Sequence, residues 1–210
     1  MATVVEQPQV EAEVGDEAGI EELPLHKISV REFRAMGDAG VFGPKTRVEL
    51  VGGQLVRKLT KKPGHEYTKS EILEAFNKRL PAGWSARGES PAELSNIDLP
   101  EPDVMILRGP KRDFSRATPG PGAVALVVEV ADTSLRSDRG PKLRRYASAG
   151  IPVYWVVDLN GAKFEVRTEP VGKGRAARYQ TMRPYASGEK VPVELDGKVV
   201  FRLSVADLLP

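Results

Sequence analysis

Apolar residues run almost without interruption over residues 123–130 (AVALVVEV), where Glu129 is the one charged side chain. A run of this kind predicts a central β-strand that is buried on both faces. Residues 153–159 (VYWVVDL) predict a second buried strand. Between the two strands we expect a helix over residues 138–149, ended by Gly150. These strands and this helix would form the centre of the fold.

The segments around this centre alternate in polarity or follow a helical period. Residues 46–59 (TRVELVGGQLVRKL) predict two strands joined by a Gly-Gly turn, and residues 64–80 predict a helix. Further strands are expected at residues 84–89, 103–107, 163–170, 177–184, 191–195 and 198–203, and short helical segments at 29–40 and 204–209. Strands surround helices without a repeating βαβα order, which favours an α+β fold with a mixed sheet.

Composition narrows the class of protein. The chain has 210 residues, no cysteine and two histidines, which excludes disulfides and thiolate metal sites and argues against a multi-histidine zinc site. No stretch approaches the roughly 18–20 apolar residues of a membrane span, and the N-terminus does not have the pattern of a signal peptide. We therefore expect a soluble, cytoplasmic protein with no membrane partner.

Charge is distributed unevenly along the chain. Residues 1–24 hold seven acidic and no basic side chains, so subtracting this −7 from the net +2 of the whole chain leaves +9 for the remainder. We predict a disordered acidic tail over residues 1–25 and a single domain over residues 26–210. An acidic tail that mimics nucleic acid is the alternative. A basic domain is compatible with a phosphate-bearing partner but does not require one.

Three acidic residues interrupt apolar strands: Glu49, Asp103 and Glu129. An ionised carboxylate in apolar surroundings must be paired, protonated or bound to a cation. Because the chain lacks thiols and clustered imidazoles, convergent carboxylates would favour Mg²⁺ or Mn²⁺. The alternative is that each carboxylate faces solvent or pairs with an arginine.

Lys142 lies on the helix that follows Glu129, with Tyr146 four residues later on the same face. A lysine near a metal-bound water could orient it or offset charge on a phosphate. An exposed helical lysine is the alternative. A hairpin Glu, an Asp that opens a strand, a Glu near the end of the next strand and then a Lys form the arrangement that a metal-dependent phosphodiesterase needs.

Four blocks resemble one family within the PD-(D/E)XK nuclease superfamily, the Uma-two family, described as "putative restriction endonucleases". These blocks are RVELVGGQLV, GHEYTKSEILEAFNKRL, EPDVMIL and the long ungapped ALVVEVADTSLRSDRGPKLRRYASAGIPVYWVVDL. The resemblance covers roughly residues 28–208. It implies a restriction-endonuclease-like core, in which helices flank a mixed β-sheet, with additional antiparallel hairpins.

The resemblance also implies roles for particular residues. Asp103 and Glu129 match the metal ligands, and Glu49 matches the acidic residue of the first hairpin, which could complete the metal site. The superfamily lysine stands two residues after the Glu, a position that is Ala131 here. The resemblance therefore implies that Lys142 on the next helix takes over its role.

Three further residues are candidates for support of the site or for phosphate contact: His65, Tyr146 and Arg139. His65 could instead cap its helix, and Tyr146 could instead pack in the core. The family usually has Asp at the position of Gly52 and Glu at that of Val153, and neither departure touches the expected ligands.

Three hypotheses for function follow. The first is an endodeoxyribonuclease that uses Mg²⁺ or Mn²⁺, needs no organic cofactor, and works as a homodimer because cutting both strands of a duplex calls for two sites. The second is a catalytically inactive nuclease fold that binds nucleic acid. Its candidate phosphate contacts are Lys61, Lys62, Lys111, Arg112, Arg116, Arg136, Arg139, Arg144 and Arg145. The third is a scaffold or dimerisation protein.

Overall fold

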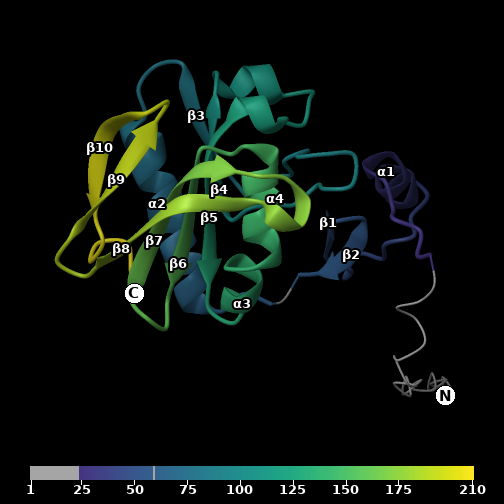
Figure 1. The fold of residues 1–210 in the computed structure, drawn as a ribbon, viewed down its shortest axis with the longest axis horizontal. Helices are drawn as coiled ribbons and strands as arrows, with labels where there is room; N and C mark the ends of the chain where they lie inside the picture. The colour runs from purple at the N-terminus through teal and green to yellow at the C-terminus, as the bar shows by residue number, and fades with distance from the viewer. Residues whose placement is uncertain (1–23, 59) are drawn as a thin grey trace, which may run out of the picture.

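A mixed sheet of six strands, in the order β3-β4-β5-β6-β7-β8, forms the centre of the fold (Figure 1). The computed structural model describes residues 24–58 and 60–210, so most of the expected acidic tail lies outside the described residues. The six strands are β3 (Trp84–Gly88), β4 (Val104–Arg108), β5 (Val124–Ala131), β6 (Val153–Asp158), β7 (Lys163–Val171) and β8 (Arg178–Ala186). Neighbours pair antiparallel except for β5 and β6, which are parallel.

The two buried strands that the sequence predicts are confirmed. Every residue of β5 and of β6 is buried. Because a parallel pair needs a crossover, the chain leaves β5, forms α3 (Leu135–Asp138) and α4 (Pro141–Ala149), and returns to β6. The single helix expected over residues 138–149 is therefore wrong in its start. A Cβ on Gly140 would meet the backbone oxygen of Arg136 at 2.8 Å, so the tight turn between the two helices requires glycine there.

Side chains of β5 and β6 alternate between two cores, one on each face of the sheet. On one face, helix α2 (Pro63–Arg79) places Ile72 and Phe76 against Val128 and Trp155. The hairpin of β9 (Lys190–Leu195) and β10 (Lys198–Ser204) packs on the same face. On the other face, Tyr146 of α4 packs with alternate residues of β5 and β6. Glu129 lies two residues after Val127 on β5, so its side chain points to the same face of the sheet, toward α4.

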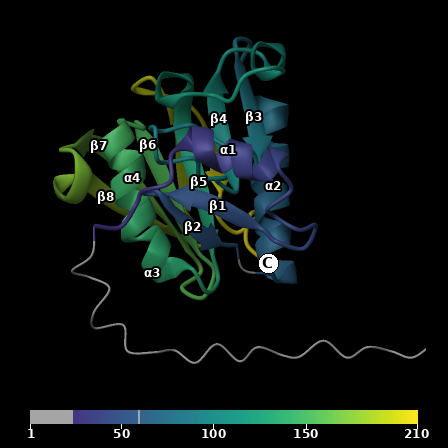
Figure 2. The same ribbon diagram turned by 90° about the vertical axis from the view of Figure 1, so that its right-hand side faces the viewer.

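The hairpin predicted around the two glycines is confirmed as β1 (Val48–Val51) and β2 (Gln54–Arg57), a two-stranded sheet of its own. Gly52 and Gly53 adopt φ of 63° and 78°, the left-handed conformation that such a turn requires. Leu50 is fully buried and pairs with Leu99, which anchors the hairpin. Figure 2 shows the hairpin between α3 and α4 on one side and α2 on the other.

Short elements complete the chain. They are α1 (Val30–Asp38), which Ser29 caps, and three 3₁₀ turns at Lys111–Phe114, Pro121–Ala123 and Gly174–Ala176. The helix expected over residues 204–209 is wrong, because the chain forms hydrogen-bonded turns there. In the described part of the chain, no helix is long and apolar enough to cross a membrane.

Candidate active site

Asp103 and Glu129 come together because β4 and β5 are neighbours. Asp103 immediately precedes β4, and Val104 pairs with Val128 across the two strands. The backbone amide of Val130 donates to Oδ2 of Asp103 over 2.8 Å. Both carboxylates are buried. The sheet register therefore places two acidic side chains side by side, as the spacing in the sequence suggests.

Lys142 reaches two of the predicted carboxylates at once. Its Nζ lies 3.2 Å from Oε1 of Glu49 and 3.2 Å from Oε1 of Glu129. Tyr146, one turn further along α4, donates its hydroxyl hydrogen to the same oxygen of Glu129 over 2.7 Å. Glu49 also accepts a 3.0 Å hydrogen bond from the backbone amide of Glu101 through Oε2. The β1–β2 hairpin, β5 and α4 thus meet at one ammonium group.

Asp138, which the sequence analysis did not identify, belongs to the same cluster. It lies at the end of α3, is 1% exposed, and its Oδ1 is 4.0 Å from Nζ of Lys142. Ser134 donates its hydroxyl hydrogen to Oδ2 over 2.5 Å, whereas Oδ1 has no hydrogen-bond partner among the described residues. Its position four residues before Lys142 is the one signal in the sequence that could have identified it.

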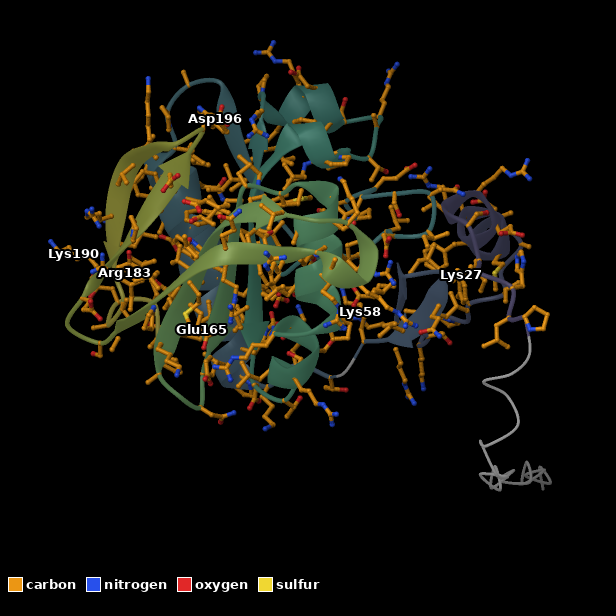
Figure 3. All side chains as sticks on the ribbon, in the orientation of Figure 1. Lys27, Lys58, Glu165, Arg183, Lys190 and Asp196 are labelled. Atoms are coloured by element: carbon orange, nitrogen blue, oxygen red, sulfur yellow. The ribbon has the colours of Figure 1, made fainter. Side chains whose placement is uncertain are left out.

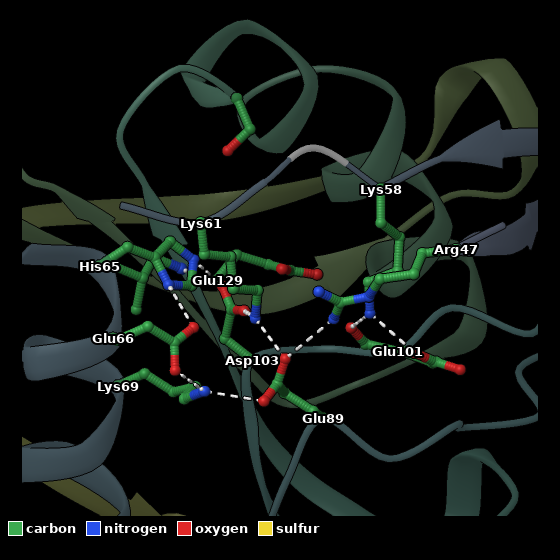
Figure 4. Close-up of polar contacts among 12 residues, drawn as sticks. Arg47, Lys58, Lys61, His65, Glu66, Lys69, Glu89, Glu101, Asp103 and Glu129 are labelled. Carbon is green, nitrogen blue, oxygen red and sulfur yellow. Dashed lines mark hydrogen bonds and ion pairs between the residues drawn. The ribbon is translucent and has the colours of Figure 1, made fainter. Parts of the chain in front are cut away.

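Asp103 is also part of a closed ring of alternating acidic and basic side chains, here called the charge ring (Figure 4). Lys61 donates to Asp103 over 2.6 Å and to Glu89 over 2.7 Å. Lys69 donates to Glu89 over 2.7 Å and to Glu66 over 2.5 Å. His65 closes the ring, with Nδ1 3.7 Å from Glu66 and Nε2 3.2 Å from Oδ2 of Asp103. The first turns of α2 are thereby tied to the ends of β3 and β4.

Glu89 adopts an uncommon backbone conformation within this ring. Its φ is 45°, in the left-handed region that residues other than glycine rarely use. Its backbone amide donates to the carbonyl oxygen of Asp103 over 3.2 Å. This conformation turns the carboxylate of Glu89 toward Lys61 and Lys69. Such strain is commonly retained at functional sites.

Burial and neighbouring charged groups shift the pKa values of this cluster in opposite directions. Burial raises the pKa of Glu129 to about 8, although Lys142 opposes the rise, and burial raises the pKa of Asp138 to about 6. Burial would lower the pKa of Lys142, but Glu129 and Glu49 raise it well above its ordinary value. Burial likewise opposes the ionisation of Asp103, yet His65 and Lys61 hold its pKa well below the usual range. Around Glu129, the carboxyl groups of Glu49, Glu129 and Asp138 thus share the ammonium of Lys142.

Glu49, Asp103, Glu129, Asp138 and Lys142 open onto one cavity of about 560 Å³. The acidic side chains of its lining are Glu49, Glu101, Asp103, Glu129, Asp132 and Asp138. The basic ones are Arg57, Lys58, Lys61, Lys62, His65, Arg136 and Lys142. The cavity thus combines convergent carboxylates with cationic groups that can contact an anionic substrate.

Comparison with known proteins identifies the family of the chain. A family model described as "Uma2: Putative restriction endonuclease" matches residues 30–206. The chain belongs to the Uma2 family. This match confirms the resemblance seen in the sequence blocks. No curated protein matches the chain.

The Uma2 fold also has a solved counterpart. A crystal structure of "a putative nuclease belonging to DUF820" from Anabaena variabilis ATCC 29413 aligns with a TM-score of 0.63. The alignment has 14% sequence identity and covers 86% of this chain and 97% of that one. At this identity the likeness concerns the fold, and it confirms the predicted fold class.

Some of the predicted site residues of this Uma2 protein lie away from the cavity. Arg139 pairs with Asp158 over 2.9 Å and with Glu165 over 2.5 Å, and it does not line the cavity. Figure 3 places Glu165 on β7, well apart from Lys58 of the cavity wall. The basic loop with Lys111, Arg112 and Arg116 follows the end of β4 opposite Asp103. Of the proposed phosphate contacts, Lys61, Lys62 and Arg136 line the cavity.

The donor set of this Uma2 member suits a hard divalent cation. Within residues 24–58 and 60–210, no three His, Asp or Glu side chains are grouped closely enough to enclose a metal. Proteins commonly hold Mg²⁺ through one or two carboxylates, with water and substrate phosphates as the other ligands. Asp103 and Glu129 provide such a pair. The unpartnered Oδ1 of Asp138 adds a second reason why a cation fits here.

Proposed function

We propose that the protein is a nuclease that hydrolyses DNA phosphodiester bonds with the help of Mg²⁺ or Mn²⁺. The observation that carries the proposal is the position of Lys142. Its ammonium lies 3.2 Å from the carboxylates of both Glu49 and Glu129, in the cavity that Asp103 also lines. Membership of a family described as "putative restriction endonuclease" supports the same reaction.

In this proposal Asp103 and Glu129 hold the cation, with the carbonyl of Val130 as a further oxygen donor. Glu49, the third predicted ligand, pairs with Lys142 in this structure, and its approach to the cation stays a prediction. The cation would lower the pKa of a bound water and polarise the phosphate. His65 and the amide of Val130 fix the orientation of Asp103 through its Oδ2. Both contacts favour the ionised form of that carboxylate, which is the form that binds a cation.

Lys142 supplies fixed positive charge. Its pKa lies well above the ordinary value, so the side chain is protonated at neutral pH and offsets the negative charge that develops on the phosphate. Tyr146 lies on the same face of α4 as Lys142 and donates to Glu129. This hydrogen bond keeps the Glu129 carboxylate beside the Lys142 ammonium. The homodimer predicted for double-strand cleavage remains a prediction and is part of this proposal.

The test is cleavage of supercoiled plasmid and of single-stranded DNA with Mg²⁺ or Mn²⁺. Asp103→Asn should reduce metal-dependent cleavage by about a hundredfold or more, since even residues that only support metal ligands cost 10–100-fold. Asp113→Asn is the matched control, because the same change is made at an exposed position beyond the far end of β4. Equal cleavage by the wild type and Asp103→Asn would rule out this assignment.

A nucleic-acid-binding module without catalysis is the second candidate. Cationic side chains line the same cavity from three places: β2, the segment that precedes α2, and helix α3. They could contact phosphates whether or not cleavage follows. Fluorescence anisotropy of labelled DNA at increasing salt measures this binding. Binding that weakens steeply with salt, together with no product under either metal, would favour the module over the enzyme.

A further inference from the structure

Lys61 lies between two carboxylates at the edge of the candidate site. Its Nζ is 2.6 Å from Oδ1 of Asp103 and 2.7 Å from Oε1 of Glu89, and its side chain is 12% exposed. It belongs to the segment that leads into α2 and lines the cavity. The sequence alone indicates no more than a surface base beside Lys62.

The two oxygens of Asp103 differ in the donors that they accept. Oδ2 accepts from the amide of Val130 over 2.8 Å and contacts Nε2 of His65 at 3.2 Å. Because a carboxylate oxygen offers about two lone-pair positions, Oδ2 is occupied. Among the described residues, Oδ1 accepts from Lys61 alone. A cation that binds Asp103 would therefore use Oδ1, where the Lys61 ammonium lies.

An ammonium group and a divalent cation on one oxygen repel each other, and the repulsion is large where both are shielded from water. Glu89 offers the ammonium a second position, since its carboxylate already accepts from Lys61. It also accepts from Lys69 over 2.7 Å and lies 3.4 Å from Arg47. The charge ring therefore contains an acceptor for Lys61 outside the proposed metal site.

We propose that Lys61 is an internal counter-ion of Asp103 that a divalent cation displaces, so that this lysine sets the affinity of the site for metal. Glu89 holds the displaced ammonium. The inference rests on the proposed function, because it takes Asp103 as a metal ligand. It adds a residue that tunes the affinity of the metal site and that has no part in the superfamily motif.

Isothermal titration of the full chain with Mn²⁺, in the absence of DNA, tests the proposal. Lys61→Met removes the charge and keeps most of the volume, and it should tighten Mn²⁺ binding by about tenfold, as expected when a close charge of the same sign is removed from a shielded site. Lys78→Met, at a position of α2 that does not line the cavity, is the matched control. Its side chain is 68% exposed and pairs with Glu74, so binding should change less than about twofold.

Glu89→Gln gives a second, opposite test. Glutamine keeps an oxygen that can accept from Lys61 but lacks the negative charge, so Lys61 should stay on Asp103, and Mn²⁺ should bind several-fold more weakly. In the double variant with Lys61→Met, most of this loss should vanish, since the two residues act through one contact. Thermal denaturation of each variant confirms that it is folded.

The outcomes separate this inference from the proposed function. Mn²⁺ affinity that is unchanged or weaker in Lys61→Met overturns the counter-ion role and leaves the proposed nuclease intact. Absence of Mn²⁺ binding in both the wild type and Lys61→Met overturns the inference together with the metal site.

Discussion

The hydroxyl of Tyr146 donates a 2.7 Å hydrogen bond to the Glu129 oxygen that also lies 3.2 Å from Lys142. Tyr146 and Lys142 are one turn apart on α4, so a single helix face determines both contacts. Glu129 comes from the central strand of the sheet. The orientation of the buried Glu129 carboxylate therefore depends on how α4 packs on the sheet.

Tyr146→Phe should separate the polar role of this residue from its packing. The aromatic ring still packs against Tyr154, with the ring centroids 5.0 Å apart, while the buried hydrogen bond is lost. We expect a loss of about 1–3 kcal/mol in the free energy of unfolding, as for a buried hydrogen bond to a carboxylate. We also expect slower cleavage with an unchanged KM. Urea denaturation and steady-state kinetics measure the two effects, and an unaltered rate would restrict Tyr146 to core packing.

Lys142→Met should destabilise the fold through the acids that it leaves behind. Glu49, Glu129 and Asp138 would lose their shared cation in a buried setting. We expect a cost of about 3 kcal/mol at pH 8, and a smaller cost at pH 5, where Glu129 and Asp138 take up protons.

Lys78→Met is the control for this substitution. Lys78 pairs with Glu74 on the exposed surface of α2, so its loss should cost at most about 0.5 kcal/mol. Chemical denaturation of both variants makes the comparison. Equal costs at the two positions would mean that the contacts of Lys142 contribute no more than a surface pair.

Asp138 should make stability depend on pH between about 4 and 7. Burial raises its pKa from an ordinary value of 3.8 to about 6, so the native state binds more protons than the unfolded state in this window. The contribution of Asp138 to stability must then fall as pH rises from 4 through 6, by roughly 3 kcal/mol, and level off above that range.

Asp138→Asn should remove this pH-dependent fall in stability. The difference in unfolding free energy between wild type and variant should therefore change between pH 4 and pH 7. Urea denaturation at pH 4, 5, 6 and 7 measures it, with the exposed Asp113→Asn as control. Wild-type and Asp138→Asn curves that run parallel would contradict the assigned acidity.

Gly140→Ala should distort the crossover that carries Lys142. A Cβ at this position would lie 2.8 Å from the backbone oxygen of Arg136, which cannot move aside as a flexible side chain could. We expect a loss of about 1–3 kcal/mol in stability and a larger relative loss of cleavage. At Gly120 nothing lies within 4 Å of an added Cβ, so Gly120→Ala should be close to neutral. Thermal denaturation and the plasmid assay report both quantities.

The sequence predicted the central strands and a cluster of Glu49, Asp103 and Glu129, because carboxylates within apolar runs have few structural explanations. Lys142 was added by its place on the helix after Glu129 and by the resemblance to the family. The two-fold alternation of β5 fixes the face on which Glu129 lies, so its proximity to the following helix could be anticipated.

Other parts of the site gave no such signal. Asp138, Lys61 and Glu89 lie in segments rich in polar residues, where sequence pattern does not indicate burial. The sequence predicts Arg139 as a candidate for support of the site or for phosphate contact. It lies at the break between α3 and α4, where the chain turns its side chain toward Asp158 and Glu165. The position of this break decides which polar groups face the cavity.

The crossover between β5 and β6 has a consequence for how such sites are assembled. Glu129, Asp138, Lys142 and Tyr146 all lie within residues 129–146, whereas Asp103 and Glu49 come from earlier parts of the chain. Residues 124–158 therefore form a continuous cassette that carries two carboxyl groups, an ammonium and a hydroxyl already arranged. A chimera that exchanges this cassette between relatives would inherit those groups together and would take the remaining carboxylates from its host.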